Sequence, residues 1–168
     1  MSDLYPWYRL VEGPDLTQGD RLNACPVIRP LESGQFEKLL ANVVVLSQSC
    51  DLANDKLEIV LVCPVFSLTD LAASVEILRT RKGREELRRG HLIGYHLLNR
   101  CEILGHESDF LVCDFRSLLG VHVSVAKSQA SKYGKRLGLQ PPYREHLAQA
   151  FARFVMRVGL PTDVPPFK

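Results

Sequence analysis

The strongest structural signal in this 168-residue chain is the stretch Asn42-Val43-Val44-Val45-Leu46-Ser47-Gln48-Ser49-Cys50-Asp51. Its β-branched, apolar half predicts a buried strand, and the five polar or reactive side chains that follow predict an abrupt end to that strand. A second apolar run, Leu57 to Val65, comes shortly afterwards, and Asn54-Asp55 between the runs is typical of a turn. We therefore expect an antiparallel hairpin that displays the polar cluster, Ser47 to Asp51, where a ligand can reach it.

The composition fits one domain. A chain with 46% hydrophobic and 24% charged residues encloses a single core and is too short for two typical domains. A formal net charge of +2 does not by itself indicate nucleic acid or membrane. Five cysteines lie mostly inside apolar segments, which predicts packed, reduced thiols, and no run has the length of a membrane span or a secretory signal. The sequence thus predicts a cytoplasmic protein with no membrane partner.

Strand and helix patterns alternate on either side of the predicted hairpin. Residues 20–28 predict an edge or irregular strand, and residues 35–41 predict a short helix. Thr69 is expected to cap an internal helix that ends near Lys82-Gly83, with residues 84–89 extending or restarting it. Three further strands are expected at residues 92–98, 110–115 and 121–125.

The most regular helix pattern lies near the C-terminus. Pro141-Pro142 suits a helix start, and apolar residues from Tyr143 to Val158 recur on one face until Gly159 and Pro161 stop the pattern. Several short strands with helices packed on them predict an α+β fold, built as a small curled sheet or barrel. We expect one domain over residues 1–168, with the barrel at about 18–126, a helical part at about 127–160 and an extended tail at 161–168.

Short motifs occur in a fixed order around the two apolar runs. They are Gly19-Asp20 before the first strand, Val43-Val44-Val45-Leu46-Ser47, Val60-Leu61-Val62-Cys63-Pro64-Val65 running on to Thr69, and the terminal helix. This order resembles the MazF/PemK family of toxin endoribonucleases over residues 19–69 and the terminal helix. The resemblance implies a small SH3-like β-barrel, here with an internal helix and a long C-terminal amphipathic helix.

The same resemblance implies an RNA-directed, metal-independent endoribonuclease of a toxin–antitoxin or bacterial defence system. Members of the family carry Arg-Pro directly before the Val-Val-Leu-Ser strand, and Ala41-Asn42 occupies that place here. The residues expected to steady the phosphate and position the scissile linkage are therefore Arg21 or Arg29 together with Ser47, Ser67 or Thr69. The implied partners are RNA, an antitoxin-like protein and a second copy of the chain, and no cofactor is implied.

The polar cluster has two interpretations that the sequence leaves open. Gln48, Ser49, Cys50 and Asp51, with His96, bind a ligand, or the cluster is a turn whose side chains satisfy local backbone groups. Cys50 is likewise either a nucleophile with a histidine base or an inert thiol. The corresponding alternative for the whole protein is a non-catalytic module that binds a ligand or partner.

Basic residues gather in one segment. Six of them, set against Glu85 and Glu86, leave an excess of four positive charges within residues 79–89: Arg79, Arg81, Lys82, Arg84, Arg88 and Arg89. This basic stretch is either a nucleic-acid-binding surface or a solvated helix face with Glu/Arg pairs, and it contains no aromatic residue. The terminal helix carries a polar stripe, which is either its solvated side or an interface: His146, Gln149, Arg153 and Arg157.

Four residues at intervals of five invite a metal interpretation: His91, His96, Cys101 and His106. Zinc ligands normally come in pairs two to four residues apart, and residues five apart on a strand point to opposite faces. We therefore expect no metal site.

Overall fold

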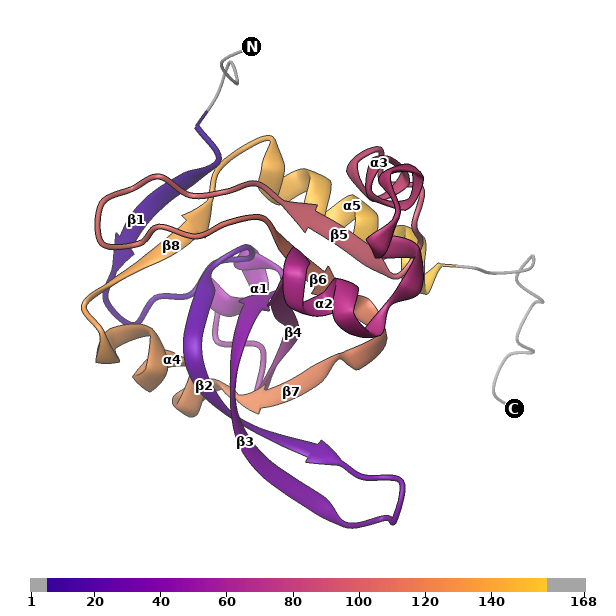
Figure 1. Cartoon of the computed structure of the whole chain (residues 1–168). Coiled ribbons are helices and arrows are strands. Elements are labelled where there is room, and N and C mark those ends of the chain that lie inside the picture. Colours follow the sequence, from indigo (N-terminus) through magenta and orange to yellow (C-terminus); the bar gives the residue numbers. More distant parts are fainter. Residues whose placement is uncertain (1–5, 157–168) are drawn as a thin grey trace, which may run out of the picture.

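The computed structural model describes residues 6–156, which form an α+β fold with a mostly antiparallel sheet (Figure 1). The strands are β1 (Tyr8–Glu12), β2 (Arg21–Pro30), β3 (Phe36–Val45), β4 (Ile59–Ser67), β5 (Tyr95–Leu98), β6 (Leu111–Asp114), β7 (Leu119–His122) and β8 (Lys135–Leu139). The helices are α1 (Ser49–Ala53), α2 (Leu68–Ser74), α3 (Arg81–Arg88), α4 (Val123–Lys132) and α5 (Tyr143–Val155), with 3-10 turns η1 (Glu76–Arg79) and η2 (Phe115–Ser117). None of these helices combines the length and apolar character that crossing a bilayer requires. The predicted helix stop at Gly159 and Pro161 and the predicted tail lie outside the described residues.

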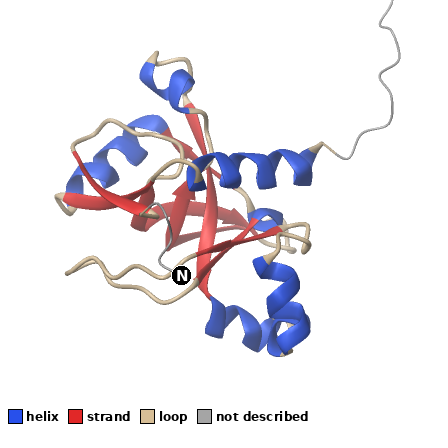
Figure 2. Ribbon diagram, turned by 90° about the horizontal axis from the view of Figure 1, so that it is seen from above, coloured by secondary structure: helices blue, strands red, loops and turns tan. Residues whose placement is uncertain are grey.

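Strand β4 is the centre of the larger sheet. It pairs antiparallel with β3 in the register Val43↔Pro64, which confirms the predicted hairpin, although α1 rather than a tight turn joins the two strands. Val62 pairs with Val45 of β3 and with Leu119 of β7, so these two strands lie on opposite edges of β4. The last residues of β4 pair with β6, which in turn pairs with β5. Figure 2 shows the helices around the outside of these strands.

The apolar run Val43-Val44-Val45 at the end of β3 contacts two hydrophobic cores, one on each face of the strand. Val44 packs with Cys63, Leu98 and other residues of one cluster, whereas Val43 and Val45 pack in a second cluster on the opposite face. All three valines are fully buried. A strand covered on both faces needs a continuous apolar sequence rather than an alternating one, which explains the three consecutive valines.

The predicted closed barrel is not formed by the described residues. The larger sheet has the order β2-β3-β4-β6-β5, with β7 attached to β4, and its end strands β2 and β5 do not pair with each other. Strands β1 and β8 form a separate two-stranded sheet. β2 is an edge strand with a bulge between Leu22 and Cys25, as the prediction of an edge or irregular strand for residues 20–28 requires.

The predicted helix at residues 35–41 is wrong, because this segment is the first half of β3. Its backbone pairs with β2 from Pro30↔Phe36 to Cys25↔Ala41, and Leu39 and Ala41 pack against the core while Phe36 and Leu40 are exposed. Apolar residues at positions 36, 39 and 40 fit a helical face, but pairing with a neighbouring strand overrides that local pattern. The resulting β2–β3 hairpin projects from the body of the molecule (Figure 1).

Two further boundaries differ from the predictions. Residues 127–160 are not purely helical, since β8 lies among them and pairs with β1, more than a hundred residues away in sequence. The strand predicted at 121–125 ends at His122, whose side chain accepts a hydrogen bond from the Ser124 N–H at the start of α4. The first difference arises from a distant strand pairing and the second from a local helix cap.

The internal helix also begins and divides differently from the prediction. Ser67 rather than Thr69 is the N-cap of α2, and its hydroxyl accepts a hydrogen bond from the Asp70 N–H at 3.0 Å. Gly83 lies inside α3 and does not end the segment, because a new N-cap, Thr80, starts α3 by accepting from the Gly83 N–H. A Cβ at Gly83 would stand 1.9 Å from the Ile77 carbonyl oxygen, so the close turn from η1 into α3 requires glycine.

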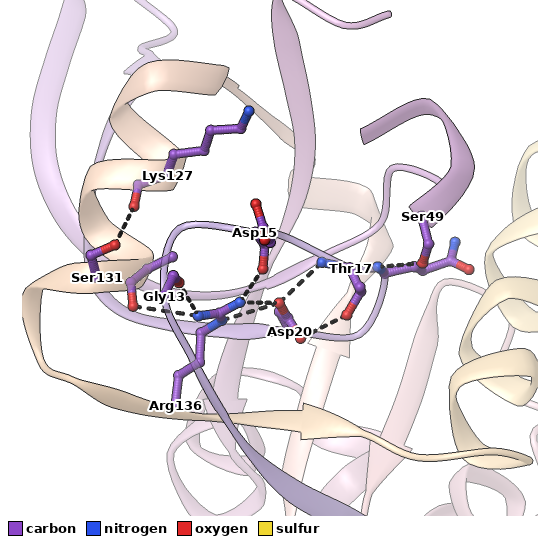
Figure 3. A network of polar contacts seen from close by, with 10 residues as sticks. Gly13, Asp15, Thr17, Asp20, Ser49, Lys127, Ser131 and Arg136 are labelled. Carbon is purple, nitrogen blue, oxygen red and sulfur yellow. Dashed lines mark hydrogen bonds and ion pairs between the residues drawn. The ribbon is translucent and has the colours of Figure 1, made fainter. Parts of the chain in front are cut away.

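A buried ion pair joins the start of β2 to β8. Asp20 is fully buried, and its Oδ2 accepts from Nε and Nη2 of Arg136 at 3.0 and 2.8 Å. Thr17 donates to the same carboxylate through its backbone N–H and its hydroxyl (Figure 3). Arg136 also donates to the carbonyl oxygens of Gly13 and Asp15, so every group of the pair has partners.

We predict that Arg136→Met lowers the free energy of unfolding by about 3–5 kcal/mol, because it leaves the Asp20 carboxylate buried without its counter-ion. The measurement is chemical denaturation at neutral pH. Lys135→Met is the matched control one residue away: its ion pair with Glu12, at 3.3 Å, is exposed on both sides and should contribute less than about 1 kcal/mol. Equal losses in the two variants would contradict the role given to the buried pair.

Candidate nucleic-acid interface

The basic stretch lines one open groove on the surface of α3 and η1. Its volume is about 890 Å³, and its walls carry the side chains of Arg79, Arg81, Arg84, Glu85, Arg88 and Arg89. Leu97 of β5, Leu68 and Phe110 supply its apolar part. We call this pocket the basic groove. The aromatic residue that the basic stretch itself lacks therefore comes from a segment more than twenty residues further along the chain.

Two of the five arginines in the basic groove, Arg79 and Arg84, are held in place by uncharged partners. Nε of Arg79 donates to the Ala72 carbonyl and Nε of Arg84 to the Leu78 carbonyl, both at 2.8 Å. Carbonyl partners orient a guanidinium without cancelling its charge. Arg81 is exposed, as is Lys82 beside it.

One carboxylate serves two of the arginines. Glu85 accepts hydrogen bonds from Arg88 and from Arg89, at 2.7 Å for the shortest contact of each. These bonds lower the pKa of Glu85 to about 2. The Glu/Arg pairs expected on a solvated helix face are therefore present at Glu85. Five arginines and one glutamate still leave the groove strongly positive.

A second pocket adjoins the basic groove and shares Arg88, Arg89, Leu97 and Phe110 with it. Its volume is about 520 Å³, and it lies between β5 and α5. We call it the His96 pocket; its remaining lining comes from Trp7, Leu87, Gly90, His96, Asn99, Tyr143, His146, Gln149 and Arg153. β5 contacts both α5 and α3, and Figure 1 shows the three elements in the same part of the molecule.

Among the residues that line this second pocket, His96 has a strongly lowered pKa. Its Nε2 is buried and has no hydrogen-bond partner among the described residues. Burial, followed by the nearby charges of His146 and Arg153, lowers its pKa to about 4. His146, Gln149 and Arg153 of the polar stripe thus line this pocket, which the sequence alone did not indicate, and Arg157 lies outside the described residues.

The two serine hydroxyls of the polar cluster accept hydrogen bonds from backbone groups of other segments. Ser47 Oγ accepts from the Leu61 N–H at 2.8 Å, and Ser49 Oγ accepts from the Gln18 N–H at 3.0 Å. Gln48 and Cys50 are exposed, and neither lines the basic groove or the His96 pocket. The two hydroxyls thus bond to backbone groups of distant segments, β4 and the loop before β2, and not to the backbone of a local turn.

Asp51 of the same cluster lies 3.7 Å from Lys56 Nζ. Cys50 has Gln48 Oε1 and Asp51 Oδ1 near its sulfur, at 3.7 and 3.9 Å, and no histidine is among these contacts. The structure therefore does not place His96 with the cluster, although the sequence prediction grouped them as one ligand site.

The two candidate phosphate-binding arginines lie apart. Arg21 points into the interior, where Nη1 donates to Ser108 Oγ at 3.3 Å and burial lowers the pKa of the guanidinium. Arg29 is exposed and pairs with Glu37 near the end of the β2–β3 hairpin. The bulge in β2 between these two arginines changes which face of the strand each one occupies.

Two of the predicted catalytic residues do share a cavity. A pocket of about 560 Å³, here called the hairpin pocket, is lined by Arg29, Ser67, Asn42 and Arg116 among others. Thr69 is exposed on α2 and Ser47 lies elsewhere, so neither belongs to the pocket. The hairpin pocket also contains Ala41 and Asn42, the place where the MazF/PemK family carries Arg-Pro.

The residues spaced at intervals of five lie in different surroundings in the fold. No group of three or more possible ligands comes together among residues 6–156. His91 pairs with Glu86 at 3.0 Å, Cys101 is buried in the core, and His96 lines its own pocket.

Comparison with protein-family models, curated proteins and solved structures gave no match for this chain.

We predict that acidification destabilises the fold through His96. Its pKa is about 4 in the folded protein and 6.5 in the unfolded chain, so below pH 6.5 the unfolded chain binds a proton that the folded protein does not. This contribution to stability is complete above pH 6.5 and is lost as the pH falls toward 4, by up to about 3 kcal/mol. Denaturation of the parent and His96→Gln between pH 7 and 4 measures it, because the other titrating groups are common to both. Parallel pH curves for the two proteins would contradict the prediction.

Proposed function

We propose that this chain binds single-stranded RNA in the basic groove. The observation that carries the proposal is that five arginine side chains line one groove together with apolar residues that include Phe110. Arginines attract the phosphate backbone, and an aromatic ring beside them offers a face on which a base can stack. Arg100 lies over one face of the Phe110 ring, 4.8 Å from its centre, so a stacking base would replace this guanidinium or use the other face of the ring.

The choice of RNA follows from the resemblance to MazF/PemK proteins. Under this proposal, β2, β3, β4 and β7 correspond to strands of an SH3-like barrel that remains open in this chain, and the protein belongs to a toxin–antitoxin or defence system. A single strand is favoured over a duplex because stacking needs bases that are not paired with a complementary strand. The binding role needs no catalytic group, so it also covers the non-catalytic alternative.

A second candidate function is endoribonuclease activity at the hairpin pocket. Arg29 and Ser67, which the resemblance assigned to phosphate binding and positioning, line this pocket together with Arg116. Arg29 and Arg116 would stabilise charge on a phosphodiester in its transition state. Each of them is paired with a carboxylate, Glu37 and Asp114 respectively, which a bound phosphate would have to displace or share.

For RNA binding, we predict that the double variant Arg81→Gln/Arg84→Gln weakens the affinity for a twelve-nucleotide single strand about tenfold or more at low salt. Each lost phosphate contact should also reduce the slope of log affinity against log salt by about 0.7. Fluorescence anisotropy with end-labelled RNA, between about 50 and 200 mM salt, measures both quantities.

The matched control is Lys132→Gln/Lys135→Gln, which removes the same charge from α4 and β8, away from α3 (Figure 1). It should leave the affinity nearly unchanged. If both double variants weaken binding equally, the interaction is a general charge effect and the groove is not the binding site.

The nuclease candidate predicts that Arg29→Ala and Ser67→Asn each reduce cleavage of a mixed RNA substrate by about a hundredfold. Asparagine also caps helices well, so Ser67→Asn removes the hydroxyl while keeping α2 capped. Glu37→Gln is the control, because it leaves Arg29 in place and should preserve cleavage. A purified parent protein that cuts no RNA ends this candidate and leaves the binding function intact.

A further inference from the structure

The His96 pocket continues the basic groove toward α5 and is built from five separate parts of the chain. Leu87 to Gly90 at the end of α3 form one side, and β5 with Asn99 and Phe110 forms the floor. Residues of α5 form the opposite side, and Trp7 closes one end. A volume of about 520 Å³ is within the usual range for pockets that hold a small ligand.

The described residues that line this pocket include no aspartate or glutamate. They do include three arginines, Arg88, Arg89 and Arg153, and two histidines. The guanidinium of Arg153 reaches across from α5, since a Cβ built on Gly90 would be 3.6 Å from its Nη2. Glu85 bonds to Arg88 and Arg89 from the side of the groove, so one negative charge faces three positive ones and a net charge of +2 remains.

A buried nitrogen in the same pocket lacks a partner. Nε2 of His96 is shielded from solvent and makes no hydrogen bond within residues 6–156. A buried polar atom without a partner costs free energy, and a ligand oxygen reaching the pocket would supply the missing hydrogen bond. His146 also lines the pocket and adds a second imidazole close to His96.

Aromatic surface lies at the edges of the charged site. Trp7 and Tyr143 stack on each other, with ring centres 3.7 Å apart and planes inclined by 11°. Phe110 is shared with the basic groove. The pocket thus combines a cationic centre with flat apolar walls, the two features that a nucleotide uses through its phosphate and its base.

We propose that the His96 pocket binds a phosphate monoester on a nucleotide, as found at a phosphorylated end of an RNA chain or in a free mononucleotide. A monoester carries about −1.5 to −2 charges at neutral pH, whereas an internal phosphodiester carries only one. The charge of a monoester matches the net charge of +2 that remains when the one negative charge of Glu85 is set against Arg88, Arg89 and Arg153. This inference rests on the proposed function, because the RNA in the basic groove would deliver its terminus to the adjoining pocket.

The test compares one twelve-nucleotide RNA in three forms: 5′-phosphate, 3′-phosphate and hydroxyl at both ends. We expect one phosphorylated form to bind the parent protein about tenfold more tightly than the hydroxyl form, as two or three added charge-assisted hydrogen bonds would give. In Arg153→Gln and in His146→Gln, both changes at exposed positions of α5, the ratio of these two affinities should fall toward one. In Arg81→Gln/Arg84→Gln both affinities should fall while their ratio is kept.

Each outcome separates the two proposals. Equal affinity for all three RNA forms overturns the monoester site and leaves RNA binding intact, whereas no binding of any form overturns both. A phosphate preference that persists in Arg153→Gln and His146→Gln places the monoester outside this pocket and overturns the assignment. If uridine monophosphate competes with the phosphorylated RNA and uridine does not, the free nucleotide uses the same site. If uridine monophosphate fails to compete, the ligand is restricted to the RNA terminus, and the free-nucleotide part of the proposal is overturned.

Discussion

The ion pair between Asp20 and Arg136 is the contact on which the placement of the remaining elements depends. Removing two charges from water is costly, so the pair persists only because Thr17 and two backbone carbonyls complete its hydrogen bonds. Gly138 of β8 packs directly against the carboxylate, where a Cβ would stand 2.8 Å from Asp20 Oδ1. The pair therefore fixes β8 against the loop that precedes β2.

The position of β8 in turn sets the geometry of the His96 pocket. β8 pairs with β1, and the next residue, Gln140, donates from its backbone to the Trp7 carbonyl and from its side chain to the Tyr8 carbonyl. Tyr143 begins α5 three residues later, which brings its ring onto Trp7. The central strand β4 positions the other side through β6 and β5, which carries His96. Two separate series of strand pairings therefore position the pocket. The pairing of β1 with β8 positions Trp7 and Tyr143, and the pairing of β4, β6 and β5 positions His96.

The sequence predicted what depends on local pattern and missed what depends on distant pairing. Three consecutive valines indicated a strand correctly because burial on both faces requires such a run. The helix predicted at 35–41 failed because β2 supplies backbone partners that local spacing does not reveal, and β8 went unnoticed because its partner β1 lies at the other end of the chain. For the site, the basic stretch was visible in the sequence, whereas Phe110, Trp7 and Tyr143 reach it only through the fold. The polar cluster attracted attention by its composition, but its two serines bond to backbone groups.

The central claim, that RNA lies along α3, Phe110 and α5, is tested most directly by titrating an isotope-labelled sample with unlabelled single-stranded RNA and recording amide chemical shifts. The account predicts that the perturbed amides gather in α3, in β5 with the segment around Phe110, and along α5 from Tyr143 to Arg153. Perturbations confined to the Ser47–Asp51 cluster or to the β2–β3 hairpin would contradict it.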